Sequence, residues 1–437
     1  RRNQKVVEEA PSAFLDEATR AAMGAQAVAL AQAVGYRSAG TIEFIVDRDR
    51  DFYFLEMNTR LQVEHPVTEL VTGLDLVEEM IRIAAGEKLR LRQDEVAFGG
   101  WAIESRIYAE DPSRNFLPSV GRLTHYRPPA ADLVPGAVIR TDSGVVEGSE
   151  IALFYDPLIA KLCTHAPTRE AATDAIADAL DAFVLDGIRH NIPFLSALMA
   201  HPRWREGRIS TAFIAEEFPG GLEPLPLDEA EVPVFAVVAA SAGLLEAARL
   251  ARAGGGAAAA AAPGSEWVVM LDRRPVPVRL VKGEPQSPLD LMLAVGEGPP
   301  LRVDTAWRPG ERLWQGTVAG APVTAQIVRE GHEWLVSRRG KSARARLLTP
   351  RAAELAALMP ERAVADAGRH LLCPMPGVVL AVMVAEGQKV EPGEPLATVE
   401  AMKMENVLRA EREAVVAKIH VAPGDSLAVD QVIMDFE

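Results

Sequence analysis

Cysteine is nearly absent from this sequence of 437 residues, which holds only two. Cys163 and Cys373 lie far apart along the chain, so they build neither a disulfide framework nor a four-ligand zinc site. The sequence therefore excludes the disulfide-rich secreted class of proteins and fits a reducing compartment.

Positive charge is also scarce. The chain has 46 Lys and Arg against 61 Asp and Glu, which gives a formal net charge of −15. A field of that sign repels nucleic acids and anionic membranes, so we expect neither as a partner. The longest apolar run, residues 232–245, is too short to cross a bilayer and is followed by charged residues. We interpret it as a buried amphipathic helix.

Apolar residues make up 49% of the chain, which is enough to build several cores. The length predicts two to four domains, and we place them at 1–86, 87–218, 219–366 and 367–437. The chain opens on Arg1 without an initiator Met, so we expect it to be part of a longer protein.

Apolar periodicity predicts an α/β first half. It indicates helices at residues 15–34, 74–85, 168–186, 192–199 and about 234–252, and strands at 40–46 and 52–56. From residue 267 to 348, short β-type runs alternate with turn residues. We expect a small antiparallel barrel or sandwich that packs on the helix preceding it.

The last segment contains an internal repeat with an offset of 37 residues. The repeat aligns Gly387 with Gly424, and its register holds at Val390 and Leu427 and again at Leu396 and Ile433. Two copies are too few for a solenoid, so we expect a pseudo-twofold pair of β-units that close on one core.

One candidate site begins at Glu56. In an extended chain, alternate side chains share a face, so the side chains on one face would be Glu56, Asn58, Arg60, Gln62 and Glu64. Glu43 lies on the partner strand and brings a second carboxylate toward Glu56. Oxygen ligands of this kind suit Mg²⁺ or Mn²⁺ at a nucleotide's phosphates, although the solvated face of an edge strand shows the same pattern.

A second candidate site is Lys403, at the midpoint of the repeat, between Met402 and Met404. A lysine on the hairpin that joins two half-barrels projects into solvent, as a lysine presented to a modifying enzyme must. Most exposed lysines are ordinary surface residues. Two methionines beside it are hard to explain as core, and they favour the modified lysine.

These motifs resemble biotin-dependent carboxylases. Ala401-Met402-Lys403-Met404 resembles the biotinyl carrier domain, and Glu56-Met57-Asn58-Thr59-Arg60 resembles the second half of an ATP-grasp biotin carboxylase. Residues 371–377 and 426–430 are similar to the α subunits of the propionyl-CoA carboxylase family. The resemblance implies a multidomain α/β plus all-β fold: the C-terminal half of the carboxylase, a helix-plus-barrel docking domain and a β-barrel carrier. The family's N-terminal domain and its Gly-rich lid are absent, so we expect this chain alone to be inactive with ATP.

The resemblance also implies the roles of individual residues. Lys403 would carry covalent biotin, flanked by Met402 and Met404. Glu64 would be the general base, and Arg140 would stabilise the biotin enolate. The ligands of Mg²⁺ or Mn²⁺ at the ATP site would be Glu43, Glu56 and Asn58. The residues that bind bicarbonate would be Lys5, Arg60, Gln62 and Val63.

The implied reaction is ATP- and bicarbonate-dependent carboxylation of biotin for transfer to propionyl-CoA. The implied partners are biotin protein ligase and a carboxyltransferase β subunit, the latter in a large hetero-oligomer. The implied localisation is the bacterial cytoplasm, which we favour, or the mitochondrial matrix. Other interpretations stay open: 3-methylcrotonyl-CoA or acetyl-CoA as acceptor, a non-catalytic carrier and scaffold, or a lipoyl carrier.

Overall fold

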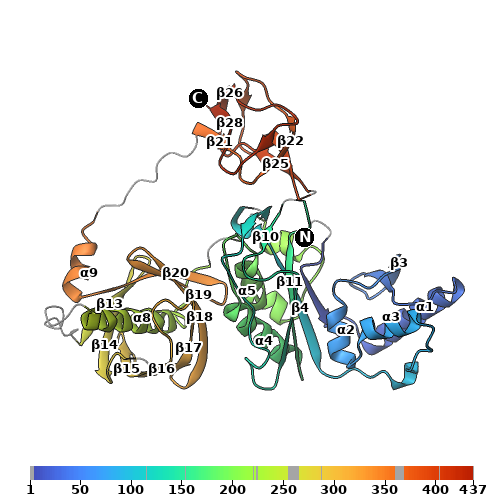
Figure 1. Ribbon diagram of the computed structural model, residues 1–437, viewed down its shortest axis with the longest axis horizontal. Helices are drawn as coiled ribbons and strands as arrows, with labels where there is room; N and C mark the ends of the chain where they lie inside the picture. The colour runs from blue at the N-terminus through green and yellow to red at the C-terminus, as the bar shows by residue number, and fades with distance from the viewer. Residues whose placement is uncertain are drawn as a thin grey trace.

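The computed structural model describes residues 4–114, 116–152, 154–219, 221–222, 225–253, 265–286, 288–359, 369–402 and 404–436. Figure 1 shows three bodies: an α/β body formed by the first half of the chain, a barrel beside it, and a small β domain above. The predicted domain boundaries remain predictions, but the order of these bodies along the chain agrees with them.

A four-stranded antiparallel sheet organises the α/β body. Its strand order is β1 (Val7–Ala10), β4 (Trp101–Tyr108), β11 (Leu158–Ala166) and β9 (Val138–Ser143). Two helices, α4 (Arg169–Ala182) and α5 (Ile192–Ala200), supply much of the apolar core on one face. The helix α2 (His65–Thr72) contacts β1, β4 and β11.

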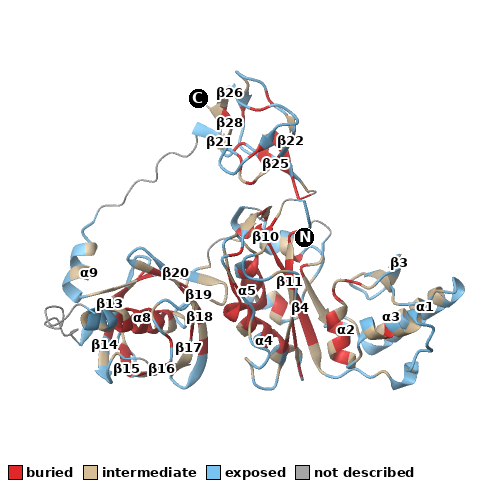
Figure 2. Cartoon of the chain, viewed as in Figure 1, coloured by how far each residue is buried: buried red, intermediate tan, exposed pale blue. Residues whose placement is uncertain are grey.

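The two faces of this sheet differ in chemistry because side chains alternate along β4. Ile103 and Ile107 point into the apolar core, where they join Phe194 of α5. Glu104 and Arg106 point to the opposite face. The charged face is therefore the one that can hold a polar site. Figure 2 shows buried residues concentrated in β4, α4 and α5.

A hairpin of β2 (Thr41–Val46) and β3 (Phe52–Asn58) lies beyond α2, with α1 (Glu17–Ala33) and α3 (Leu76–Ala84) beside it. The predicted helix at 15–34 therefore exists, but none of its residues is buried. The predicted extended stretch from Glu56 to Glu64 is wrong. The strand ends at Asn58, and Glu64 is the N-cap of α2.

The structure differs from the sequence prediction at two further helices. The helix α2 itself was not predicted; proline near its first turn fixes a backbone angle suited to a helix start. The predicted helix at 168–186 ends at Ala182, and the chain continues as β12 (Val184–Asp186), which pairs with β8 (His125–Arg127).

Short elements complete the α/β body and its connection to the barrel and carrier. They are η1 (Gln93–Glu95), β5 (Glu110–Asp111), η2 (Pro112–Arg114), β6 (Leu117–Pro118), β7 (Gly121–Arg122), β10 (Glu150–Ile151), α6 (Pro202–Arg205), α7 (Phe213–Glu217) and α9 (Pro350–Ala356).

The predicted barrel is confirmed as a closed barrel of eight antiparallel strands. These are β13 (Glu266–Leu271), β14 (Arg274–Lys282), β15 (Leu289–Val295), β16 (Leu301–Thr305), β17 (Leu313–Val318), β18 (Ala321–Glu330), β19 (Glu333–Arg338) and β20 (Lys341–Leu348).

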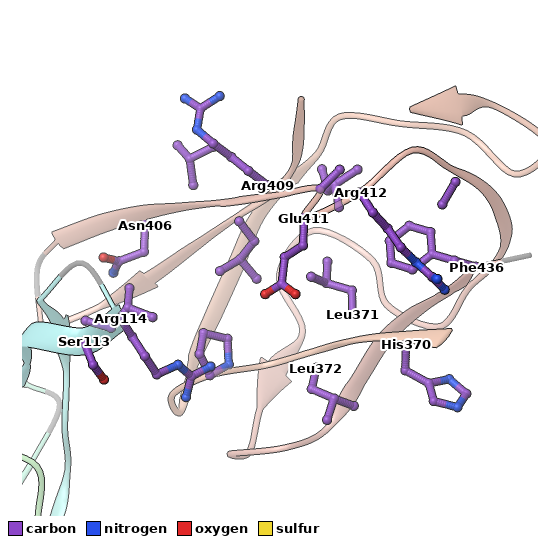
Figure 3. A pocket seen from close by; sticks show the side chains of 17 residues that line it. Ser113, Arg114, His370, Leu371, Leu372, Asn406, Arg409, Glu411, Arg412 and Phe436 are labelled. Carbon is purple, nitrogen blue, oxygen red and sulfur yellow. The ribbon is translucent and has the colours of Figure 1, made fainter. Parts of the chain in front are cut away.

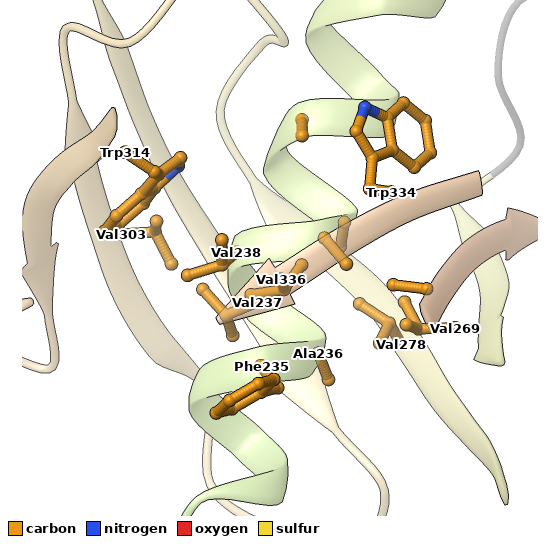
Figure 4. Packing of buried hydrophobic residues seen from close by; sticks show 14 of the residues in the cluster. Phe235, Ala236, Val237, Val238, Val269, Val278, Val303, Trp314, Trp334 and Val336 are labelled. Atoms are coloured by element: carbon orange, nitrogen blue, oxygen red, sulfur yellow. The ribbon is translucent and has the colours of Figure 1, made fainter. Parts of the chain in front are cut away.

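The helix α8 (Val232–Ala253) supplies much of the barrel's core. It contacts six of the eight strands, and Figure 4 shows Phe235 and Val238 packed toward strand residues. Ser241 Oγ on the helix accepts a hydrogen bond of 3.0 Å from the Trp314 indole. By length and composition alone the helix could cross a membrane, but 61% of its most apolar window is buried inside the protein. The interpretation as a buried helix therefore holds.

The 37-residue repeat is visible in the strands of the C-terminal β domain. Each of three strands has a counterpart 37 positions later: β22 (Gly377–Val382) and β26 (Ala414–Ile419), β23 (Lys389–Val390) and β27 (Ser426–Leu427), β24 (Pro395–Ala401) and β28 (Val432–Phe436). With β21 (His370–Leu372) and β25 (Met404–Arg409) they form two four-stranded sheets, each containing strands of both halves. The predicted β-units therefore share one core.

Candidate functional site

The hairpin brings two carboxylates together through its register. Glu43 on β2 is the cross-strand partner of Glu56 on β3. Asn58 lies next to both, and its Nδ2 donates hydrogen bonds of 2.9 Å to Glu43 and 3.1 Å to Glu56. The three predicted metal ligands therefore form one cluster at the end of the hairpin.

The residues around this cluster suit a hard divalent cation. Mg²⁺ is commonly held by one or two protein carboxylates together with substrate phosphates, and Glu43 and Glu56 provide such a pair. Asn58 offers an amide oxygen beside them. The described part of the chain holds no group of three or more His, Cys, Asp or Glu that could bind a metal unaided. This donor set therefore fits a metal ion that a nucleotide helps to bind.

Lys5 connects this cluster to Glu64. Its ammonium lies 3.2 Å from Glu43 Oε1 and contacts Glu64 Oε1. Gln62 Nε2 donates a hydrogen bond of 2.9 Å to Glu43. Arg60 lies at the exposed edge, where its guanidinium is 3.4 Å from Asn58 Oδ1. The structure therefore brings together Lys5, Arg60, Gln62 and the metal-ligand cluster.

Glu64 is a buried carboxylate held between two cations. Arg106 Nη2 donates to its second oxygen at 2.7 Å, and about a tenth of each side chain is exposed. Burial alone would raise the pKa of Glu64, but the hydrogen bond from Lys5 and the charges of Lys5 and Arg106 outweigh it. The net pKa lies below the ordinary carboxyl value, so Glu64 is ionised at neutral pH and can accept a proton.

The Val63 backbone makes a contact that the sequence did not reveal. Lys161 on β11 donates a hydrogen bond of 2.9 Å to the Val63 carbonyl and lies 3.1 Å from Asp142. Only 12% of the Lys161 side chain is exposed. Lys161 therefore fixes the peptide that directly precedes Glu64.

Arg140 on β9 is held by two carboxylates. It makes two hydrogen bonds to Asp142, at 2.8 and 2.9 Å, and one to Glu69 at 2.7 Å. The hydrogen bonds to Asp142 and then to Glu69 raise its pKa above the usual arginine value. The arginine that touches Glu64 is Arg106, which sequence reasoning missed. In the sequence, the only indication of Arg106 was that it is a charged residue inside an otherwise apolar strand, two positions from Glu104.

The biotinylation residue proposed from the sequence, Lys403, lies outside the described residues. Its neighbours are described: Met402 is buried and belongs to the apolar core cluster of the α/β body, while Met404 is half-buried at the start of β25. The expectation that neither methionine is a core residue is therefore wrong for Met402, whose side chain packs against the α/β body. A cavity of about 870 Å³ lies where the carrier meets this body. Figure 3 shows Ser113 and Arg114 on one side of it and Asn406 and Glu411 on the other.

Four family models match the chain in sequence order. Residues 1–92 match the ATP-binding domain of the carbamoyl-phosphate synthase L chain, and residues 104–216 match the biotin carboxylase C-terminal domain. Residues 235–362 match the propionyl-coenzyme A carboxylase BT domain. Residues 369–436 match a model described as biotin-requiring enzyme.

The chain is similar along its whole length to propionyl-CoA carboxylase alpha chains. The alpha chain of the bacterium Ruegeria pomeroyi is 53% identical over 453 residues, and the mitochondrial alpha chain of Mus musculus is 42% identical over 444 residues. All of this chain is aligned in both cases, against 66% and 60% of the relatives. The chain therefore spans somewhat less than two thirds of these proteins.

The chain is also similar over about half its length to solved biotin carboxylase structures. The biotin carboxylase domain of a thermophilic 2-oxoglutarate carboxylase, bound to bicarbonate, is 45% identical, with a TM-score of 0.47. The comparison covers 49% of this chain and 48% of that one. The chain belongs to the family of biotin-dependent carboxylases that includes the propionyl-CoA carboxylase alpha chains.

Proposed function

We propose that this chain contributes the bicarbonate-activating half of a biotin carboxylase and the biotin carrier of an acyl-CoA carboxylase, with propionyl-CoA as acceptor. The observation that carries this proposal is Glu64, an ionised carboxylate held between Lys5 and Arg106 beside a metal-ligand set. Similarity over the whole chain to propionyl-CoA carboxylase alpha chains supports the choice of acceptor.

Glu64 is the general base of this proposal. The ionised, positioned carboxylate accepts the bicarbonate proton as the oxyanion attacks phosphorus. Lys5 and Arg106 lie on either side of Glu64, so they offset the negative charge of the substrate. Glu43, Glu56 and Asn58 would hold the Mg²⁺ or Mn²⁺ of ATP, and ATP would supply the phosphoryl group. Phosphoryl transfer depends on such positioning and charge neutralisation.

Arg140 keeps its proposed role as the arginine that stabilises the biotin enolate. Its guanidinium donates hydrogen bonds to Asp142 and Glu69. Asp142 pairs with Lys161, which donates to the Val63 carbonyl directly before Glu64. Arg106, in contact with Glu64, adds a second positive charge beside the base.

The rest of the proposal concerns attachment and transfer. Biotin on Lys403, added by a biotin protein ligase, supplies the mobile carboxyl carrier. A separate carboxyltransferase β subunit completes the reaction in a large hetero-oligomer, and the barrel around α8 is the segment that binds it. The net charge of −15 fits a bacterial cytoplasmic enzyme with neither nucleic acid nor membrane as partner.

The experiment compares Lys403→Arg with Lys389→Arg in the full-length polypeptide that contains this chain, purified with its β subunit. Lys389 is an exposed carrier lysine paired with Glu413, so its variant controls for loss of a positive side chain. Only Lys403→Arg should abolish avidin binding and fixation of labelled bicarbonate onto propionyl-CoA. Avidin binding that survives in Lys403→Arg contradicts the carrier assignment.

Two control substrates test the acceptor. Assays of the unmodified complex with 3-methylcrotonyl-CoA and acetyl-CoA should give lower kcat/KM than propionyl-CoA. A higher kcat/KM for either control substrate would make that substrate the acceptor instead of propionyl-CoA. The proposed carboxylase role would be unaffected. Biotinylation without any bicarbonate-dependent ADP release would instead indicate a non-catalytic carrier and scaffold.

A further inference from the structure

A buried carboxyl group lies directly behind the contact between Arg106 and Glu64. Glu104 has no exposed surface, and its cross-strand neighbours are Glu8 on β1 and Cys163 on β11. Its Oε1 lies 3.6 Å from Arg106 Nε and accepts no hydrogen bond, although it is fully buried. Its Oε2 accepts only a weak hydrogen bond of 3.5 Å from the Cys163 thiol. Glu104 therefore lacks the partners that a buried carboxylate anion needs.

Glu8 makes the ionised state of Glu104 still less favourable. Directly opposed residues on neighbouring strands have Cβ atoms about 4.5 to 5.5 Å apart, and two carboxylates shielded from water at that spacing do not both ionise readily. Glu8 is half-buried. Its pKa is raised to about 7, chiefly by desolvation and also by the charges of Glu64 and Glu104, against the opposing charges of Lys5 and Arg106. Burial also raises the pKa of Glu104 to about 7, opposed by Lys161 and Arg106.

The charge balance of this sheet face favours a bound proton. Carboxyl groups outnumber the cations around it. The carboxyl groups are Glu8, Glu43, Glu64, Glu69, Glu104 and Asp142; the cations are Lys5, Arg106, Arg140 and Lys161; and Cys163 and His65 are the other titratable groups. Most of these carboxylates have a close ion pair with Lys or Arg. Of the six carboxyl groups, Glu8 and Glu104 have the weakest contacts with Lys or Arg.

We propose that Glu8 and Glu104 hold one proton between them and that this protonated pair positions Arg106 against Glu64. The inference rests on the proposed function, in which Glu64 is the base. An ionised Glu104 would compete for the guanidinium, which lies 3.6 Å from Glu104 and 2.7 Å from Glu64. With the proton in place, Arg106 stays committed to Glu64. Both members are positioning residues, because they act through Arg106.

The first test does not depend on activity. Glu104→Gln keeps the shape of the protonated acid and removes its ionisation. Because the pKa in the folded protein is raised above 4.5, the stability that this pair contributes is fully present below about pH 4.5 and is lost as the pH rises through about 7. Ionisation should therefore loosen the sheet around Cys163, which is fully buried.

The measurement is the rate of thiol alkylation in the native protein between pH 6 and 9. The ratio of the wild-type rate to the Glu104→Gln rate at Cys163 should rise at least about tenfold across this range, the equivalent of one pKa unit. In the folded protein, an ionised Glu104 also raises the pKa of the Cys163 thiol and slows wild-type alkylation, so this direct effect opposes the expected rise and cannot produce it. Cys373, buried in the carrier, is an internal control whose ratio should not change. A constant ratio at Cys163 overturns the proposal.

Glu8→Gln provides a second variant, since either member can lose the same proton. It should remove the same pH dependence, and the double variant should add nothing further. Additive effects of the two substitutions would show that Glu8 and Glu104 titrate separately and would overturn the shared proton.

The kinetic test uses the holoenzyme and kcat/KM for bicarbonate. The ratio of wild type to Glu104→Gln should change with a midpoint near pH 7, while Glu79→Gln should give a ratio independent of pH. Glu79 is a buried carboxylate on α3 that pairs with Arg90, outside this sheet face. Parallel profiles for wild type and Glu104→Gln would overturn the link to Arg106. An inactive holoenzyme that still shows the Cys163 result would count against the proposed function alone.

Discussion

Replacing Arg106 by Met tests how far the basicity of Glu64 depends on the guanidinium. The pair is 2.7 Å apart and nearly buried, and removing one partner of a buried ion pair costs about 3 to 5 kcal/mol. Lys5 still contacts the other oxygen of Glu64, so we expect the lower end of this range. At about 1.4 kcal/mol per pKa unit, the pKa of Glu64 should rise by about two units.

The assay is the pH dependence of kcat/KM for bicarbonate in the full-length enzyme with free biotin as acceptor. Glu64 works as the ionised base, so a higher pKa should move the acid limb of the profile to higher pH by about two units. Arg106→Lys keeps the charge and should shift the limb less. Arg140→Met, whose contacts are Asp142 and Glu69, should leave the position of the limb unchanged. An unshifted limb in Arg106→Met would refute this account.

Three further substitutions or deletions test separate parts of the molecule. Glu64→Gln removes basicity with little change of shape, so the bicarbonate-dependent rate should fall about 10²- to 10⁴-fold, and a loss confined to the KM for ATP would place Glu64 at the metal instead. Ser241→Ala leaves the Trp314 indole without its acceptor in the barrel core, so unfolding followed by tryptophan fluorescence should show a loss of about 1 to 3 kcal/mol, and an unchanged denaturation midpoint would contradict the described core. Deleting residues 232–348 should abolish co-purification with the β subunit while carboxylation of free biotin continues, and retained co-purification would move the docking site elsewhere.

Elements with a strong local pattern could be predicted from the sequence. The offset of 37 residues, read from pairs such as Leu396 and Ile433, reappears as strands related by the same offset. The barrel followed from alternation and regularly spaced turns. The helix α8 was expected at about 234–252, close to its observed bounds. In each case the period of the apolar residues corresponds to a buried face.

Contacts between distant segments could not be predicted in this way. Arg106 and Lys161 reach the site from neighbouring strands of a central sheet, whose pairing depends on the tertiary fold. In the sequence they are charged residues within apolar strands, a pattern that an ordinary solvent-facing strand shares. The prediction of one extended face from Glu56 to Glu64 was wrong. It continued the alternation of the strand into residues that lead to the start of the helix α2. Asn58, Gln62 and Glu64 still meet near Lys5 and Glu43, but through a strand end and a helix N-cap.

The net charge of −15 has to be reconciled with a site for two anions, bicarbonate and ATP. Charges separated by more than about 8 to 10 Å are largely screened at physiological ionic strength, so the mean field of the surface has little effect inside the site. The local field is set by the cations Lys5, Arg106 and Lys161, whose side chains are shielded from solvent to different degrees. A proton held by Glu8 and Glu104 would remove one negative charge from that location. The protonated pair behind the site therefore lowers the negative charge that an anionic substrate meets, in a chain whose overall charge opposes one.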